Sequence, residues 1–328
     1  MLQLTPAPHI SSGTNTKKIM YSVILALTPA LIGSVYFFGW RALFLTILSV
    51  LSAEVTEYLF QKVTGRESRI SNGSAVITGI LLAFNISVNS PWWLPVAGSI
   101  FAIFVAKQVF GGLGYNIFNP ALAGRAFLMA SWPSLMTGRW IAPNSGTLSG
   151  LSSITLDGVT QATPLSLLKL HQGESVIQSL NSPGMLKALF FGNVGGCIGE
   201  TSALLLLIGA LYLFIKGYAD WRISVGYIGS IFIFSGILYL FRVSPVNPLF
   251  HILAGGVMLG GLFMATDLVT SPVTRKGRWI FGFGGGIICV LIRLWGGYPE
   301  GVSYSILLMN MFVPLLDRMA PKVYGGLK

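Results

Sequence analysis

The sequence has few charged residues. Asp, Glu, Lys and Arg make up 9% of its 328 residues, whereas about a quarter of a soluble domain is charged. So few charges cannot cover a water-facing surface, which excludes a soluble globular protein. The apolar residues, 53% of the chain, come in runs of about 20, the length that crosses a hydrocarbon core. We therefore expect an all-α, polytopic membrane protein.

Cysteine and histidine are also scarce. Cys197 and Cys289 stand far apart, and an iron–sulfur cluster needs about four thiolates, so this chain alone cannot hold one. We interpret both cysteines as small buried apolar residues. The three histidines, His9, His171 and His251, suggest no Ser–His–acid set. We predict no metal site and no catalytic residue in this chain by itself.

Acidic residues are half as frequent as basic ones, 10 against 21, which gives a net charge of +11. In a soluble protein this excess would indicate nucleic-acid binding. In a membrane protein the cytoplasmic loops collect Lys and Arg. We therefore expect membrane lipid, and no nucleic acid, among the partners.

Ten apolar segments are typical of membrane-spanning helices. They lie at about 19–39, 42–60, 73–88, 94–109, 119–135, 199–215, 223–241, 249–264, 279–294 and 302–316. Between the fifth and the sixth, the chain becomes rich in Ser, Gly, Thr, Asn and Pro, with short helices expected at 165–171 and 183–191. The predicted organisation is an N-terminal segment (1–18), a five-helix half (19–136), an insert (137–196), a second five-helix half (197–318) and a tail (319–328).

The distribution of basic residues predicts the topology. With the N-terminus inside, the outer loops receive only Arg41, Arg139, Lys169, Lys187 and Arg242, and the inner loops and tails receive most of the others. Lys and Arg accumulate on the cytoplasmic side. We therefore expect both termini in the cytoplasm, the insert outside, and the protein in the cell (inner) membrane.

Two halves of five helices each must be inverted relative to one another, because five is odd. Weak self-similarity supports this. Lys107 precedes Gly111-Gly112 before the fifth segment, and Arg293 precedes Gly296-Gly297 before the tenth. Inverted repeats tend to form a site near the membrane midplane, where broken helices meet.

The densest motif runs from 111 to 125. Pro120 suits the first turn of a helix and Asn119 its N-cap, so this helix start could receive an anion or a polar ligand. Asn116 belongs to the same loop, and Arg125 should face an acid, a phosphate or an aqueous cavity. The alternative is a structural re-entry loop with an ordinary cap.

A second polar stretch, 266–274, contains Asp267 and Thr270 ahead of basic residues. Its carboxylate and hydroxyls could line a flavin or cation site. Equally, they could cap helix ends at a cytoplasmic loop.

Carboxylates inside the membrane indicate function by default. Glu54 and Glu57 lie three residues apart on one helix face, and Glu200 lies near the outer end of the sixth segment. We treat them as candidates for a Na⁺ or H⁺ path. The alternative is that the first two pair with Lys62 and Arg66.

The run Gly282-Phe283-Gly284-Gly285-Gly286 only superficially resembles a dinucleotide-binding fingerprint. No strand precedes it and it lies within an apolar segment, so it favours close helix packing.

The insert contains the polar, turn-prone stretch 155–164, with threonines at 155, 160 and 163. On its own this stretch is ordinary loop chemistry.

Three motifs in order resemble one known family. They are Pro8-His9-Ile10 followed by Lys17-Lys18-Ile19-Met20, the run 111–125, and Ala265-Thr266-Asp267 with Thr270-Ser271-Pro272-Val273-Thr274. Together they resemble the D subunits of Rnf electron-transport complexes and the related B subunits of Na⁺-translocating NADH:quinone reductases. The resemblance covers essentially the whole chain.

The resemblance implies a covalent flavin. In that family a flavin transferase esterifies the phosphate of FMN to the last threonine of an extracytoplasmic Asp-x-x-Ser/Thr-Gly-Ala-Thr motif. Asp157, Thr160, Ala162 and Thr163 match this spacing, and Gln161 stands where glycine is usual. Thr163 is then the acceptor, on what we expect to be an exposed loop.

The resemblance also implies a function. Members sit among other membrane and peripheral subunits that pass electrons between ferredoxin and NAD⁺ while moving Na⁺ or H⁺, so the chain would be part of a translocase. It implies a second, noncovalent flavin such as riboflavin, for which the candidate residues are Asn116, Asn119, Arg125, Asp267 and Thr270. The halves should resemble the urea and ammonium transporter arrangement. The alternative function is an inverted-repeat channel or transporter for a small solute, without a redox cofactor.

Overall fold

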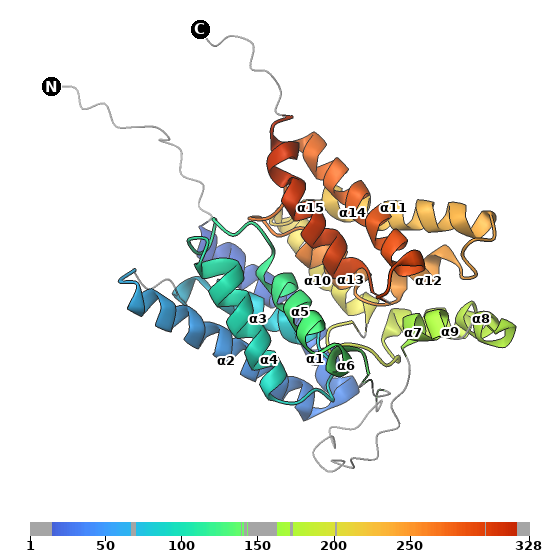
Figure 1. Ribbon diagram of the computed structural model, residues 1–328, viewed down its shortest axis with the longest axis horizontal. Coiled ribbons are helices and arrows are strands. Elements are labelled where there is room, and N and C mark those ends of the chain that lie inside the picture. The colour runs from blue at the N-terminus through green and yellow to red at the C-terminus, as the bar shows by residue number, and fades with distance from the viewer. Residues whose placement is uncertain are drawn as a thin grey trace, which may run out of the picture.

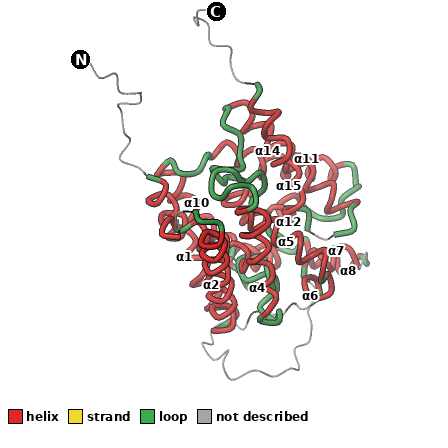
Figure 2. The backbone as a smooth tube through the Cα atoms, turned by 60° about the vertical axis from the view of Figure 1, so that its left-hand side comes forward, coloured by secondary structure: helices red, strands yellow, loops and turns green. Residues whose placement is uncertain are grey.

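A computed structural model describes residues 15–66, 70–138, 140, 143, 163–170, 173–200, 202–298 and 300–319. All regular elements among them are helices (Figure 2), and one isolated antiparallel bridge joins Ser87 to Cys197. The α-helices are α1 (Thr16–Phe38), α2 (Trp40–Val63), α3 (Ser74–Phe84), α4 (Trp93–Ile103), α5 (Pro120–Ser131), α6 (Pro133–Thr137), α7 (Pro164–Leu170), α8 (Glu174–Leu180), α9 (Pro183–Phe191), α10 (Ala203–Lys216), α11 (Trp221–Leu240), α12 (Pro248–Leu253), α13 (Val257–Leu259), α14 (Arg275–Trp295) and α15 (Val302–Asp317). A 3₁₀ turn, η1 (Ile70–Asn72), precedes α3, and the π-helical segments η2 (Phe104–Gln108) and η3 (Gly260–Met264) extend α4 and α13.

Four helices of the described part are long and apolar enough to cross a membrane, namely α1, α2, α11 and α14. Shorter apolar helices cover Ser74–Phe84, Trp93–Gln108, Ala203–Lys216 and Val302–Asp317. The chain is therefore an all-helical, multi-pass membrane protein. Each of the ten predicted segments contains helix, but the count of ten membrane spans stays a prediction.

Three predicted segments are not continuous helices. The fifth, 119–135, is interrupted at Trp132 between α5 and α6. The third ends at Phe84, and the residues after it pair with the segment before α10, where Ile198 N–H donates to Ile86 O and Gly199 N–H donates to Phe84 O, each at 3.0 Å. The eighth is broken between α12 and α13, because Gly255 has a φ of +68° that few residues other than glycine adopt. The predictions of unbroken helices over 73–88, 119–135 and 249–264 were wrong at these points.

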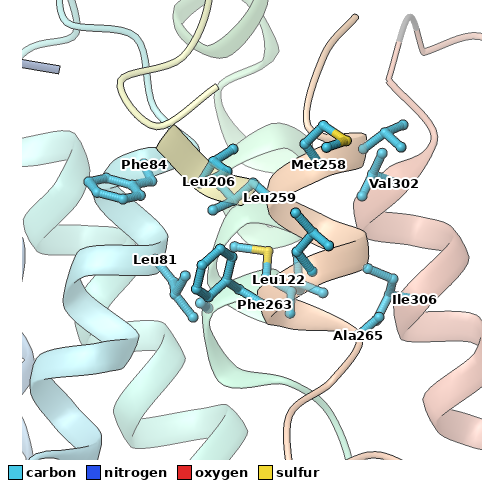
Figure 3. Close-up of a cluster of buried hydrophobic side chains, with 14 of the residues drawn as sticks. Leu81, Phe84, Leu122, Leu206, Met258, Leu259, Phe263, Ala265, Val302 and Ile306 are labelled. Carbon is cyan, nitrogen blue, oxygen red and sulfur yellow. The ribbon is translucent and has the colours of Figure 1, made fainter. Parts of the chain in front are cut away.

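The helices of the two halves occupy different sides of the molecule, with α1–α5 in blue to green and α11–α15 in orange to red (Figure 1). Between them, α1 packs against α10 and α5 packs against α15. Apolar side chains from both halves gather around α13 and η3, among them Leu122 of α5, Leu206 of α10 and Phe263 of η3 (Figure 3). This shared core joins the halves.

Chain direction defines two ends of the helix bundle. The terminal end is where α1 begins and α15 ends, and the insert end is where α1 ends and α15 begins. Helices α7–α9 lie side by side at the insert end (Figure 1) and pack through α9 against α10 and α12. The predicted short helices at 165–171 and 183–191 are confirmed as α7 and α9, whereas α8 was not predicted.

The glycine-rich run of α14 packs against α11, as the sequence predicted. A Cβ atom added to Gly282 would lie 2.7 Å from the carbonyl oxygen of Ile223, and one added to Gly286 would lie 2.5 Å from that of Tyr227. Both obstacles are backbone atoms. These glycines therefore set how closely the two helices approach.

We expect Gly282→Ala to destabilise the protein by about 1–3 kcal/mol, because the added methyl group overpacks the α11–α14 contact. Gly229→Ala is the matched control, since a Cβ at Gly229 of α11 meets nothing within 4 Å. Thermal unfolding of the detergent-solubilised protein measures both. Equal melting temperatures for the two variants would contradict this account of the contact.

Candidate functional site

A cavity opens at the terminal end between the two halves. Its walls include Asn116, Asn119 and Asp267 together with Lys107 and Phe263. Its solvent-accessible volume is about 80 Å³, room for a few water molecules. Three of the five candidate residues for a second flavin therefore share one cavity.

Asn119 is the N-cap of α5, as predicted. Its side-chain oxygen accepts from the N–H groups of Ala121 and Leu122 at 3.1 and 3.3 Å, and its amide nitrogen donates to Met264 O at 3.2 Å. Asn119 thus joins α5 of the first half to η3 of the second. Asn116 donates to Phe118 O at 3.1 Å, while its buried side-chain oxygen has no hydrogen-bond partner among the described residues.

Asp267 and Thr270 lie together in the turn after η3. The Thr270 hydroxyl donates to Asp267 Oδ2 at 3.0 Å, and the Thr270 carbonyl accepts from Asn310 of α15 at 2.9 Å. The pair closes a turn, and Asp267 also lines the cavity.

Glu57 forms a buried ion pair with Lys107 beside the same cavity. Lys107 Nζ lies 2.8 Å from Glu57 Oε2 and donates to Ser74 Oγ at 2.7 Å, while Gln108 donates to Glu57 Oε1 at 2.9 Å. Both charged side chains are 2% exposed. The alternative that Glu57 snorkels or pairs with Lys62 or Arg66 does not hold, because the π-helical turn of η2 brings Lys107 to it instead.

Glu54 lies one turn before Glu57 but differs in its surroundings. Its side chain is half-buried, whereas Glu57 is 1% exposed. The two predicted neighbours therefore do not share one environment.

Arg125 lies at the centre of a second cluster, toward the insert end. Its guanidinium is 3% exposed, is ion-paired with Glu300, and donates to Asn85 Oδ1 at 2.6 Å. Glu200 Oε1 lies 3.6 Å from Arg125 Nη1. The expectation that Arg125 faces an acid is confirmed. Its placement with Asn116 and Asn119 was wrong, since Arg125 does not line their cavity.

Thr163 begins helix α7 beside this cluster. Its hydroxyl lies 2.8 Å from Ser166 Oγ and accepts from Ser166 N–H at 3.2 Å, the geometry of an N-cap. Thr163 lines a small cavity that Glu200 and Glu300 also line. The side chain is only 8% exposed, so the expectation of an exposed acceptor does not hold for this conformation. Asp157, Thr160, Gln161 and Ala162 lie outside the described residues.

Lys169 fixes α7 to the loop that carries Glu300. Its ammonium donates to the carbonyl oxygens of Gly296 and Tyr298, the latter at 2.6 Å. Partial burial lowers the pKa of Lys169 below its ordinary value. Thr163, which precedes α7, lies beside the same cavity as Glu200 and Glu300.

Arg293 is the residue that the predicted repeat matches with Lys107. It is 2% exposed and donates to His251 O and to Ala254 O, the latter at 2.8 Å, at the broken end of α12. A guanidinium there also suits the negative end of a helix dipole.

Sequence reasoning did not identify Glu300 and Asn85 as members of the Arg125 cluster. Glu300 occurs in a Gly-Tyr-Pro-Glu-Gly turn outside the apolar segments, which is typical of a solvated loop. Only the cost of burying Arg125 signalled that an acid had to reach it.

We expect Glu57→Gln to destabilise the protein by about 3–5 kcal/mol, because it leaves the Lys107 ammonium buried without its counterion. Replacing both residues, Glu57→Leu with Lys107→Met, should recover most of this loss. Thermal unfolding in detergent measures both. A double variant no more stable than Glu57→Gln would show that the loss does not come from the unpaired charge.

Comparisons with known proteins place the chain among electron-transport proteins. The model of the family described as NQR2, RnfD, RnfE matches residues 3–325. The D subunit of the Na⁺-translocating ferredoxin:NAD⁺ oxidoreductase complex of Acetobacterium woodii is 47% identical over all of this chain and 96% of its own length. The D subunit of the proton-translocating complex of Clostridium ljungdahlii is 46% identical over 98% of this chain and 96% of its own length. The D subunit of the ion-translocating oxidoreductase complex of Stutzerimonas stutzeri is 39% identical over 95% of this chain and 93% of its own length.

Proposed function

The chain belongs to the NQR2, RnfD, RnfE family, and we propose from this membership that it is the D subunit of an ion-translocating ferredoxin:NAD⁺ oxidoreductase complex. The full-length similarity to proteins with that name carries the proposal. The chain acts with other membrane and peripheral subunits and is not catalytic alone. Both Na⁺ and protons occur in the relatives' names, so the ion is Na⁺ or H⁺.

We propose that Thr163 carries FMN as a phosphoester, made by a flavin transferase. A hydroxyl is the group that such an ester requires, and the hydroxyl and N–H of Ser166 stand beside it as donors for phosphate oxygens. When bound, the flavin would supply electron transfer in one- or two-electron steps. Because Thr163 is 8% exposed, its side chain must turn outward before a transferase reaches it.

We propose ten spans in two inverted halves, with both termini in the cytoplasm. Corresponding elements make corresponding contacts. Ser49 of α2 donates to Gly79 O of α3 at 2.7 Å, and Ser224 of α11 donates to Gly261 O of η3 at 2.8 Å. Among the described residues, the insert end carries the basic residues Arg41, Lys169, Lys187 and Arg242. The terminal end carries more of them, namely Lys17, Lys18, Lys62, Arg66, Lys216, Arg222, Arg275, Lys276, Arg278 and Arg318. This asymmetry supports the predicted orientation in the cell (inner) membrane.

The terminal-end cavity is the proposed place for a second, noncovalent flavin such as riboflavin. Asn116, with its unpartnered oxygen, and Asp267 offer polar contacts there, and Lys107 lines the same wall. Arg125 is outside this proposed site.

The covalent flavin has a direct test. Co-expressed with a flavin transferase, the chain should give a fluorescent band in a denaturing gel under ultraviolet light, and Thr163→Ala should lose that band at unchanged expression. Ser166→Ala is the matched control, because it removes a neighbouring donor but keeps the acceptor hydroxyl. A band that persists in Thr163→Ala would refute this acceptor. A chain that never gains a band would favour the alternative of a solute channel or transporter.

We also propose Glu54 as part of an ion path, because its half-buried carboxylate has a freer environment than that of Glu57. In the assembled complex, Glu54→Gln should reduce ferredoxin-driven ion uptake into vesicles several-fold, since an amide cannot carry the charge that balances a cation. Glu54→Asp keeps the charge and serves as the control. Unchanged uptake in Glu54→Gln would remove Glu54 from the path.

A further inference from the structure

Three ionisable side chains from distant parts of the chain meet at the insert end. Ligand-type atoms of Cys197, Glu200 and Glu300 all lie within 4.8 Å of one another. Cys197 and Glu200 come from the loop before α10, and Glu300 comes from the loop before α15. Arg125 of α5 lies against both carboxylates.

The two carboxylates differ in how closely the surrounding cations approach them. Arg125 contacts Glu300 directly, whereas it stays 3.6 Å from Glu200 Oε1. Arg293, the other cation near the cluster, donates to the carbonyl oxygens at the end of α12. Glu200 is 4% exposed, and its Oε1 has no hydrogen-bond partner among the described residues.

An ionised carboxylate in this position is costly. Burial penalises the charged form, because Oε1 of Glu200 has no hydrogen-bond partner among the described residues and the carboxylate has only the weak donor Cys197. A second carboxylate at close range penalises it further. A proton on one of the two removes both penalties, and Arg125 then neutralises the other. Among the described residues, Cys197, Cys289 and Arg293 are further titratable or charged groups that act on the pair.

We propose that Glu200 and Glu300 form a proton-binding pair that holds one exchangeable proton next to Thr163. A Na⁺ ion in the same place would lie beside the Arg125 guanidinium, which repels it. The proton enters from water and returns to water, so the site needs no further reactant.

The pair shares its cavity with Thr163. That cavity has a solvent-accessible volume of about 20 Å³, room for about one water molecule between the hydroxyl and the carboxylates. The glycines at the break between α12 and α13, Gly255 and Gly256, let the Glu200 carboxylate lie close to the backbone there. A Cβ atom added to Gly256 would lie 2.6 Å from Glu200 Oε1. The cavity therefore gives protons a short polar route to the pair.

This position couples the pair to whatever is attached at Thr163, a step that depends on the proposed function. Negative charge added on the Thr163 side of the cavity strengthens proton binding by the carboxylates. Reduction of a flavin attached there should accordingly be accompanied by proton uptake at the pair. Proton uptake by the pair would thus balance the negative charge of the reduced flavin. The pair lies at the insert end and is separate from the terminal-end cavity.

The first experiment needs no flavin. Infrared difference spectra of Thr163→Ala protein between low and high pH should contain the carbonyl band of a buried protonated carboxylic acid. Adding Glu200→Gln or Glu300→Gln should remove that band, and adding Glu174→Gln, at an exposed carboxylate of α8, should leave it. Thermal unfolding checks that each variant is folded.

The proposal is overturned if the band survives in both the Glu200→Gln and the Glu300→Gln backgrounds. It is also overturned if Na⁺ added at constant pH abolishes the band, because the pair would then bind Na⁺ instead. These outcomes do not depend on whether Thr163 is flavinylated.

The second experiment tests the coupling in flavinylated protein. The midpoint potential of the covalent flavin should depend less steeply on pH in Glu200→Gln than in the parent chain, and Glu174→Gln, at an exposed carboxylate of α8, should match the parent. Identical pH dependence in Glu200→Gln and parent refutes the coupling. If no covalent flavin forms, the proposed function fails while the first experiment still decides the proton-binding pair.

Discussion

The ion pairing of Arg125 is the constraint on which the arrangement of the two halves depends. A guanidinium that is 3% exposed cannot stay unpaired inside an apolar bundle. Its partners come from α3, from the loop before α10 and from the loop before α15. One side chain therefore fixes three segments of the chain relative to α5. The break between α12 and α13 leaves space for this cluster, because Gly256 lies beside it.

The two halves differ in how a buried basic residue is bound. Each has a basic residue, Lys107 or Arg293, buried near the end of its fourth helical element. The ammonium of Lys107 is neutralised by a carboxylate on α2, whereas the guanidinium of Arg293 binds backbone carbonyls where α12 ends. The lysine ammonium is a compact charge that one carboxylate can neutralise, whereas the arginine guanidinium has five N–H donors that can bind several oxygen atoms. The two buried basic residues thus differ in the groups that bind them.

Local rules were enough to predict the local features. The apolar runs predicted where helices lie, Asn119-Pro120 predicted a capped helix start, and the glycine-rich run predicted close packing of α14. The pairing of charges could not be predicted, because Glu57 with Lys107 and Arg125 with Glu300 are contacts between segments far apart in sequence. The burial of Thr163 belongs to the same class, since it depends on α7 docking through Lys169 onto the loop after α14.

The distance along the chain between Arg125 and Glu300, 175 residues, also bears on biosynthesis. At about 5–20 residues per second, a ribosome needs roughly 10–35 seconds to make the acid after it has made the arginine. Throughout that interval α5 carries a charge that no segment yet made can neutralise as Glu300 does. The first half can therefore reach its final depth and tilt only late in translation, and a chain truncated before Glu300 leaves the membrane insertion machinery with an unfinished helix bundle.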